Sequence, residues 1–161
     1  MHLYLVQHGA AKTDIEDPQR SLADEGRRTV EAVAEHLSRM SVKVSRIEHS
    51  DKLRARQTAE ILAARLRPAK GVTQMAGLAP NDDVELSYKR LDEETDTVMI
   101  VGHLPHLSRL ASRLLLEHDP GRILLKFQMA GVVKLERDAD RRWAVSWMLM
   151  PDLLPHSPKA A

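Results

Sequence analysis

The sequence contains no cysteine and few aromatic residues. The absence of cysteine from all 161 residues excludes disulfide bonds and thiolate metal sites, and it fits a reducing compartment. Phenylalanine, tyrosine and tryptophan together make up only 3% of the chain. A platform of aromatic rings for stacking nucleic-acid bases is therefore not expected.

The chain also lacks long apolar runs and an excess of charge of either sign. No stretch of 18 apolar residues is present and the N-terminus lacks a signal-peptide pattern, so we expect no membrane span and a cytoplasmic protein. The formal net charge is +1, from 24 basic and 23 acidic residues, which argues against nucleic acid as a partner. Any anion site must be local. The oligomeric state stays open.

The length predicts a single domain. A chain of 161 residues can bury one hydrophobic core but is too short for two ordinary domains, so we expect one domain over residues 1–150. The remaining segment, 151–161, has three prolines and no hydrophobic periodicity. It predicts a loosely ordered C-terminal tail.

Strands and helices alternate over the first two thirds of the chain. Apolar patterning predicts strands over 3–7, 42–49, 71–76 and 97–101. It predicts helices over 22–40, from a cap at Ser50 or Asp51 up to Pro68, over 84–91, and over 107–117 with Pro105 in its first turn. Two further strands, 130–136 and 143–150, are joined by a charged turn. This order predicts a three-layer α/β/α sandwich whose mainly parallel central sheet ends in an antiparallel hairpin.

Three polar residues follow three of the predicted strands. His8 comes directly after the first strand, Arg54 lies in the first turn after the second, and His103 follows the third. The carboxyl ends of parallel strands form the ligand crevice of an open α/β sheet, so these side chains are expected to lie together. Two imidazoles and a guanidinium beside a helix N-terminus suit a phosphate group.

The same segments resemble a known family. Residues 5–9 (LVQHG), 50–59 (SDKLRARQTA) and 101–105 (VGHLP) resemble the three signature blocks of the histidine phosphatase superfamily, which has the phosphoglycerate-mutase-like fold. The short length, residues 20–26 (RSLADEG) and residues 78–83 (LAPNDD) are similar to the SixA-type phosphohistidine phosphatase branch.

This resemblance implies a metal-independent phosphatase with no cofactor. His8 would take the phosphoryl group as nucleophile and pass it to water, while Arg54 and His103 would hold the phosphoryl oxygens. A neutral imidazole is competent for this once its other ring nitrogen donates a hydrogen bond, commonly to a backbone carbonyl. The resemblance also implies substrate contacts from residues that flank these three: Gln7, Gly9, Arg20, Ser50 and Leu104.

The sequence departs from the family pattern at Gln7, where the family usually carries arginine, and at Ala10, where it carries an acidic residue. An amide in place of a guanidinium is expected to weaken phosphate stabilisation by about one order of magnitude. Arg20 is the candidate for the missing charge. Asp82 and Asp83 are the candidates for a general acid, although a phosphohistidine leaving group needs little protonation.

Three functions stay open. The leading prediction is hydrolysis of a phosphohistidine protein. The second is hydrolysis of a small phosphorylated metabolite, and the third is a phospho-ligand binding module with little turnover because of Gln7. The spacing of His103 and His106 is also compatible with a pair of metal ligands, but without cysteine or a fixed acidic ligand it does not favour a metal hydrolase.

Overall fold

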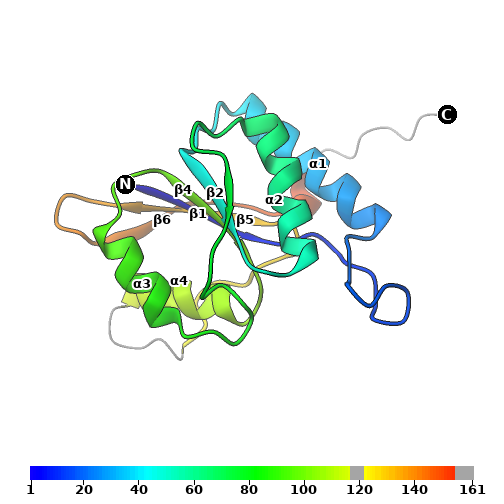
Figure 1. The fold of residues 1–161 in the computed structure, drawn as a ribbon. Helices are drawn as coiled ribbons and strands as arrows, with labels where there is room; N and C mark the ends of the chain where they lie inside the picture. Colours follow the sequence, from blue (N-terminus) through cyan, green and yellow to red (C-terminus); the bar gives the residue numbers. More distant parts are fainter. Residues whose placement is uncertain (117–121, 155–161) are drawn as a thin grey trace.

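The computed structural model describes residues 1–116 and 122–154 (Figure 1). The elements follow in the order β1 (His2–Gln7), α1 (Asp24–Arg39), β2 (Arg46–His49), α2 (Leu53–Leu66), β3 (Val72–Gln74), α3 (Val84–Glu93), β4 (Val98–Gly102), α4 (His106–Leu116), β5 (Val132–Arg137), β6 (Trp143–Leu149) and the 3-10 helix η1 (Pro151–Leu153). No helix in these two ranges is both long and apolar enough to cross a membrane.

The strands of the described residues form one six-stranded sheet in the order β3-β2-β4-β1-β5-β6. Strands β3, β2, β4 and β1 run parallel to one another, whereas β5 pairs antiparallel with β1 and with β6. The central position of β1 and β4 buries both strands fully on both faces apart from the first residue of β1. The predicted parallel sheet with a C-terminal antiparallel hairpin is confirmed.

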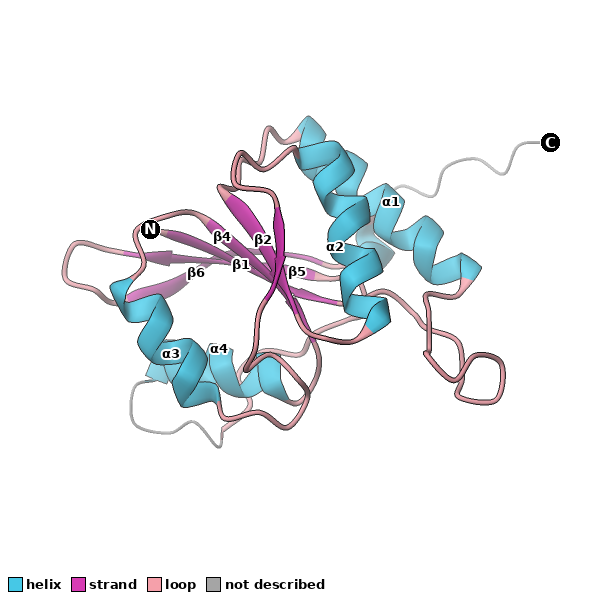
Figure 2. Cartoon of the chain, viewed as in Figure 1, coloured by secondary structure: helices cyan, strands magenta, loops and turns pink. Residues whose placement is uncertain are grey.

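Helices cover both faces of the sheet, as predicted (Figure 2). Helices α1 and α2 lie on one face, where Tyr4 and Val6 of β1 pack against them. Helices α3 and α4 lie on the other, where the alternate residues Leu3 and Leu5 point. This period of two along β1 places consecutive side chains in different cores.

The second strand and the helix after it start later than predicted. The pattern from residue 42 indicated a strand, but β2 begins only at Arg46, because its partner β4 begins at Val98 and pairs there. Val42 and Val44 are still buried, which explains their apolar character. The N-cap of α2 is Lys52, without a side-chain cap bond, rather than Ser50 or Asp51.

Two predictions near the end of the chain also need correction. Helix α4 begins at His106, so Pro105 precedes it instead of lying in its first turn, and the predicted last residue, Glu117, is outside the described residues. A loose tail was predicted over residues 151–161, but its first four residues are ordered. They form η1 and bury Leu154 against the core shared with α1 and α2. Residues 155–161 lie outside the described residues.

Candidate active site

Three elements bring His8, Arg54 and His103 together at the carboxyl end of the sheet. His8 follows β1, His103 follows β4, and β1 and β4 are adjacent parallel strands. The two imidazole ring centres are 4.9 Å apart, and Arg54 Nε donates to His8 Nε2 over 3.3 Å. In the sequence, these three residues are 46 to 95 positions apart. The sheet topology therefore assembles the constellation that the sequence predicted.

The environment of His8 fixes which ring nitrogen carries the proton. His8 Nδ1 lies 2.7 Å from the Gly9 carbonyl oxygen, which only accepts hydrogen bonds, so Nδ1 is the protonated nitrogen. Nε2 then keeps its lone pair on the side of Arg54. Burial is the main cause that lowers the pKa of His8 to about 4; the Gly9 bond opposes the shift, and the charges of Arg54 and Arg20 add to it. His8 is thus a neutral imidazole at pH 7 whose unprotonated Nε2 accepts from Arg54.

His103 is held by Ser50, at the end of the neighbouring strand. The Ser50 hydroxyl and His103 Nε2 are hydrogen-bonded at 2.5 Å, and both side chains are buried. Burial, followed by the proximity of His8 and of Arg54, lowers the pKa of His103 to about 3. His103 Nδ1 is buried without a hydrogen-bond partner among the described residues. Ser50, expected as a substrate contact, here orients the second imidazole.

One face of the first turns of α2 holds the site together. Arg54 contacts His8, Gln57 Oε1 accepts from the Leu22 amide at 2.7 Å, and Thr58 Oγ1 accepts from the Gly9 amide at 3.1 Å. The spacing i, i+3, i+4 places these three side chains on one helix face. Gln57 and Thr58 belong to the segment 50–59 that resembles a signature block, but the sequence alone predicted no role for them. Their spacing from Arg54 was the signal available.

Gly9 positions His8 through both of its backbone groups. Its carbonyl accepts from His8 and its amide donates to Thr58, so neither group is free for the substrate contact predicted for Gly9. The loop here presses against α1. A methyl group added at Gly26 would lie 2.0 Å from the Ala10 carbonyl oxygen, which only a glycine avoids. Gly26, in the first turn of α1, therefore allows this close approach.

Gln7 and Arg20 differ in burial and in their contacts. The Gln7 side chain is buried, and its Oε1 has no hydrogen-bond partner among the described residues. Arg20 takes a left-handed backbone conformation, with φ of 51°, and its Nε lies 3.1 Å from Asp14 Oδ1 in the same loop. Its charge lowers the pKa of both His8 and Arg54. Arg20 is near enough to add positive potential to the site.

The remaining predicted residues lie around this centre. Leu104 is 38% exposed between β4 and α4. Asp83 is the N-cap of α3 and accepts from the Glu85 amide, whereas Asp82 accepts from the Ala79 amide and lines a cavity of about 290 Å³ together with Asp51. Asp83 is therefore occupied as a cap. Asp82 is the one of the two predicted acids that faces a cavity.

His106 lies inside the first turn of α4 and is fully buried. Burial lowers its pKa, so the ring is neutral at pH 7. Within residues 1–116 and 122–154, no group of three or more His, Asp or Glu side chains is arranged to hold a metal ion. The ring of His106 contributes packing beneath the loop that carries Asp82.

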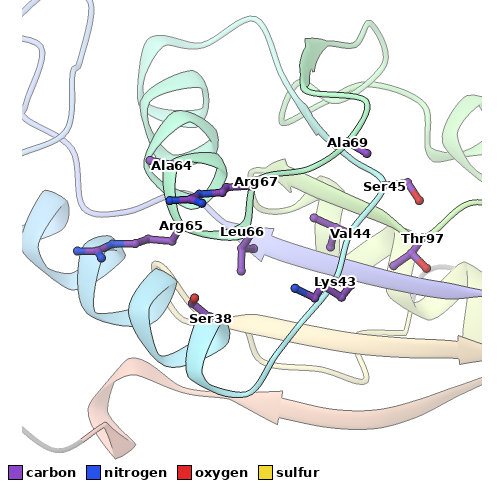
Figure 3. Close-up of a pocket in the computed structure, with 10 residues that line it drawn as sticks. All are labelled: Ser38, Lys43, Val44, Ser45, Ala64, Arg65, Leu66, Arg67, Ala69 and Thr97. Carbon is purple, nitrogen blue, oxygen red and sulfur yellow. The ribbon is translucent and has the colours of Figure 1, made fainter.

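A larger cavity, of about 650 Å³, lies away from the histidines (Figure 3). It is lined by the C-terminal ends of α1 and α2 and by Thr97, just before β4. These segments belong to the amino end of the parallel strands. The catalytic candidates and the larger cavity are thus at opposite ends of the sheet.

Comparisons with known proteins agree with this geometry. The family model described as histidine phosphatase superfamily (branch 1) matches residues 3–80. An uncharacterised protein of Picosynechococcus sp. is 36% identical over 149 residues, 88% of each chain. The phosphohistidine phosphatase SixA of Escherichia coli is 26% identical over 156 residues, 94% of each chain. The structure of the protein histidine phosphatase SixA complexed with tungstate is similar with a TM-score of 0.84 and 25% identity, over 96% of this chain and 100% of that one.

Proposed function

This chain belongs to the histidine phosphatase superfamily, in its SixA-type branch, and is a phosphatase; from that premise we propose that it hydrolyses phosphohistidine in a protein through a phosphorylated His8. The observation that carries the proposal is the hydrogen bond from His8 Nδ1 to the Gly9 carbonyl. It leaves Nε2 unprotonated beside Arg54 and ready to attack phosphorus.

The proposed reaction has two displacement steps. In the first, the lone pair of His8 Nε2 forms a bond to phosphorus as the bond from phosphorus to the leaving nitrogen breaks, and that nitrogen takes up a proton from water. In the second, a water oxygen attacks phosphorus as its bond to His8 Nε2 breaks; phosphate leaves with the water protons, and the neutral imidazole is regenerated. Arg54 and His103 hold the phosphoryl oxygens in both steps, so positioning and charge stabilisation supply most of the catalysis.

The charges around His8 support a phosphoryl ligand. Arg54 forms no ion pair with a carboxylate within the described parts of the chain, so its guanidinium is available to an anion. Arg20 also acts on His8 and Arg54 through its charge, although it pairs with Asp14, and it is the candidate to replace the guanidinium absent at Gln7. Asp82 is the better placed of the two candidate acids, since it lines a cavity together with Asp51, whereas Asp83 caps α3.

A protein substrate is favoured by the length of the chain. SixA of Escherichia coli, named a phosphohistidine phosphatase, aligns with 94% of this chain, so little of the sequence is left for an additional segment over the site. The cavity that Asp51 and Asp82 line is small, about 290 Å³. A site without a large enclosed chamber suits a side chain presented by a partner protein better than a wholly enclosed metabolite.

The experiment compares phosphate release from a phosphohistidine protein and from an aryl phosphate. We expect faster release from the protein, no release by His8→Ala from either compound, and an acid-labile phosphoryl group on His8 in rapid-quench samples. His2→Ala, at an exposed histidine of the same strand, is the matched control and should keep full activity. Faster turnover of the aryl phosphate would instead identify a small-molecule phosphatase.

The remaining alternative is a binding module with little turnover. A substitution at Gln7 tests it. If the site is otherwise complete, Gln7→Arg should raise kcat/KM about tenfold by restoring a charge-assisted contact. Phosphate binding by the original chain without His8-dependent release, unchanged in Gln7→Arg, would contradict the phosphatase proposal.

A further inference from the structure

The cavity at the amino end of the sheet concentrates positive charge. Lys43, Arg65 and Arg67 line it, with the two arginines contributed by the end of α2 and Lys43 by the segment that leads into β2 (Figure 3). The volume, about 650 Å³, is within the range of small-molecule sites. The feature is separate from the histidine site, which lies beyond the other end of the same strands.

These three cations have no carboxylate partner within the described residues. Their neighbours differ, because Arg46 and Lys70 both form ion pairs with Asp96. Nearby acidic groups are therefore already engaged by other basic residues. The positive charges of the cavity are left without local compensation, which favours an anionic ligand.

The same cations are not needed to close the ends of the helices. The C-terminus of α2 is closed by backbone, since the Arg67 amide donates to the Ala63 carbonyl at 2.9 Å. The end of α1 is closed by the Met40 and Val42 amides, which donate to His36 and Leu37 carbonyls. The ammonium and guanidinium groups around the cavity are therefore free to donate to a ligand.

Hydroxyl groups and an apolar floor complete the lining. Ser38, Ser45 and Thr97 also line the cavity, and none of their hydroxyls has a hydrogen bond with another described residue. Val44 and Leu66, which also line it, are buried and apolar. The lining thus combines hydrogen-bond donors suited to anionic oxygens with a surface suited to a nonpolar group.

We propose that this cavity is a second ligand site, for a small molecule that carries two or three phosphate-type charges on a less polar body, in the size class of a nucleoside di- or triphosphate. The three cations match the number of charges, and arginine donates to phosphate oxygens in pairs. The apolar floor accommodates the body. The site does not depend on the phosphatase reaction, because it shares no residue with the histidine centre.

The test is calorimetric titration of the full chain with ADP, pyrophosphate and adenosine at low salt. ADP should bind more tightly than pyrophosphate, adenosine should bind weakly, and the affinity for ADP should fall as salt is raised. Lys43→Glu and Arg65→Glu should each weaken ADP binding about tenfold, because a reversed charge repels the phosphates. Both variants should retain the basal phosphatase activity.

Two controls make the outcome decisive. Arg28→Glu changes the net charge equally at an exposed arginine of α1 that does not line the cavity, and it should leave ADP binding unchanged. His8→Ala should also leave it unchanged. Loss of ADP binding in His8→Ala, or equal binding by Arg65→Glu and the original chain, would overturn the site. Equal affinities for ADP and pyrophosphate would overturn the role of the apolar floor.

Discussion

The two ends of one sheet use positive charge in different ways. At the carboxyl end, Arg54 is partly buried, donates to His8 and lies beside imidazoles whose pKa values are lowered mainly by burial. At the amino end, Lys43, Arg65 and Arg67 are exposed around an open cavity and bond to no described side chain. Burial with fixed partners produces a site organised for chemistry, whereas exposure of free charges suits binding alone. Paired substitutions at the two ends test this difference.

The largest effect is expected from removing one arginine at each end. Arg54→Ala should lower kcat/KM by about 10³-fold, because the phosphoryl oxygens lose their main cation in the transition state. Arg65→Ala, at the amino end, should leave kcat/KM within about twofold. Steady-state hydrolysis of a phosphohistidine protein measures both. Comparable losses in the two variants would contradict the proposed division of roles.

The next effect concerns the glycines. Gly26→Ala should lower the free energy of unfolding by about 3 kcal/mol, because the added methyl group meets the Ala10 carbonyl and the loop must move. Gly71→Ala, at the amino end, has φ of +72° but nothing within 4 Å, so only backbone strain of about 1 kcal/mol is expected. Urea unfolding gives both values. A smaller loss in Gly26→Ala than in Gly71→Ala would show that the loop adapts.

The third comparison exchanges a threonine for valine at each end. Thr58→Val leaves the buried Gly9 amide unpaired, so we expect a loss of about 2 kcal/mol in stability and a lower kcat with little change in KM. Thr58→Ser, which keeps the hydroxyl, should restore kcat. Thr97→Val removes a hydroxyl that bonds to no described residue and should change neither quantity. An unchanged kcat in Thr58→Val would remove Thr58 from the set of positioning residues.

The last comparison is a dependence of stability on pH that originates at the carboxyl end. The folded-state pKa values of His8 and His103, about 4 and about 3, lie below the ordinary value of 6.5. The unfolded chain therefore binds protons that the folded chain does not. Stability is full above pH 6.5 and should fall by roughly 2 kcal/mol per pH unit between pH 6 and 4, because each histidine contributes up to about 1.4 kcal/mol per unit.

Urea unfolding at several pH values checks this dependence, and His8→Gln should flatten it because one of the two groups is removed. Lys43→Gln, at the amino end, removes neither histidine and should leave the slope unchanged. An identical slope in His8→Gln and the original chain would place the acid sensitivity elsewhere. The buried His106, whose pKa is also lowered, is the next group to substitute.

Local patterns predicted most of the fold and the centre of the site. Apolar runs ending in His8 and His103 located two strand ends, and parallel pairing of β1 with β4 then placed the rings together. The strand expected from residue 42 was too long, because Val42 is buried by packing rather than by pairing. The order of residues 151–154 depends on contacts of Leu154 with distant segments, which periodicity does not report.

The supporting contacts were harder to predict, because they join segments that are remote in sequence. Thr58 meets Gly9 across 49 positions, and Gln57 meets Leu22 across 35. Arg20 has a left-handed backbone conformation and contacts Asp14 and Lys12 within its own loop, which its residue type did not indicate. Residue types alone predict which groups are chemically able to act. They do not predict which groups hold others in place.

The shared face of α2 has a further consequence for what the chain tolerates. Its first turns hold the nucleophile, the backbone of the loop after it, and the segment that enters α1, all through side chains three or four positions apart. Inserting a single residue ahead of Arg54 within the helix would rotate the whole set by about 100°. All three attachments would be lost together, so this turn accepts substitutions one at a time but no change in its length.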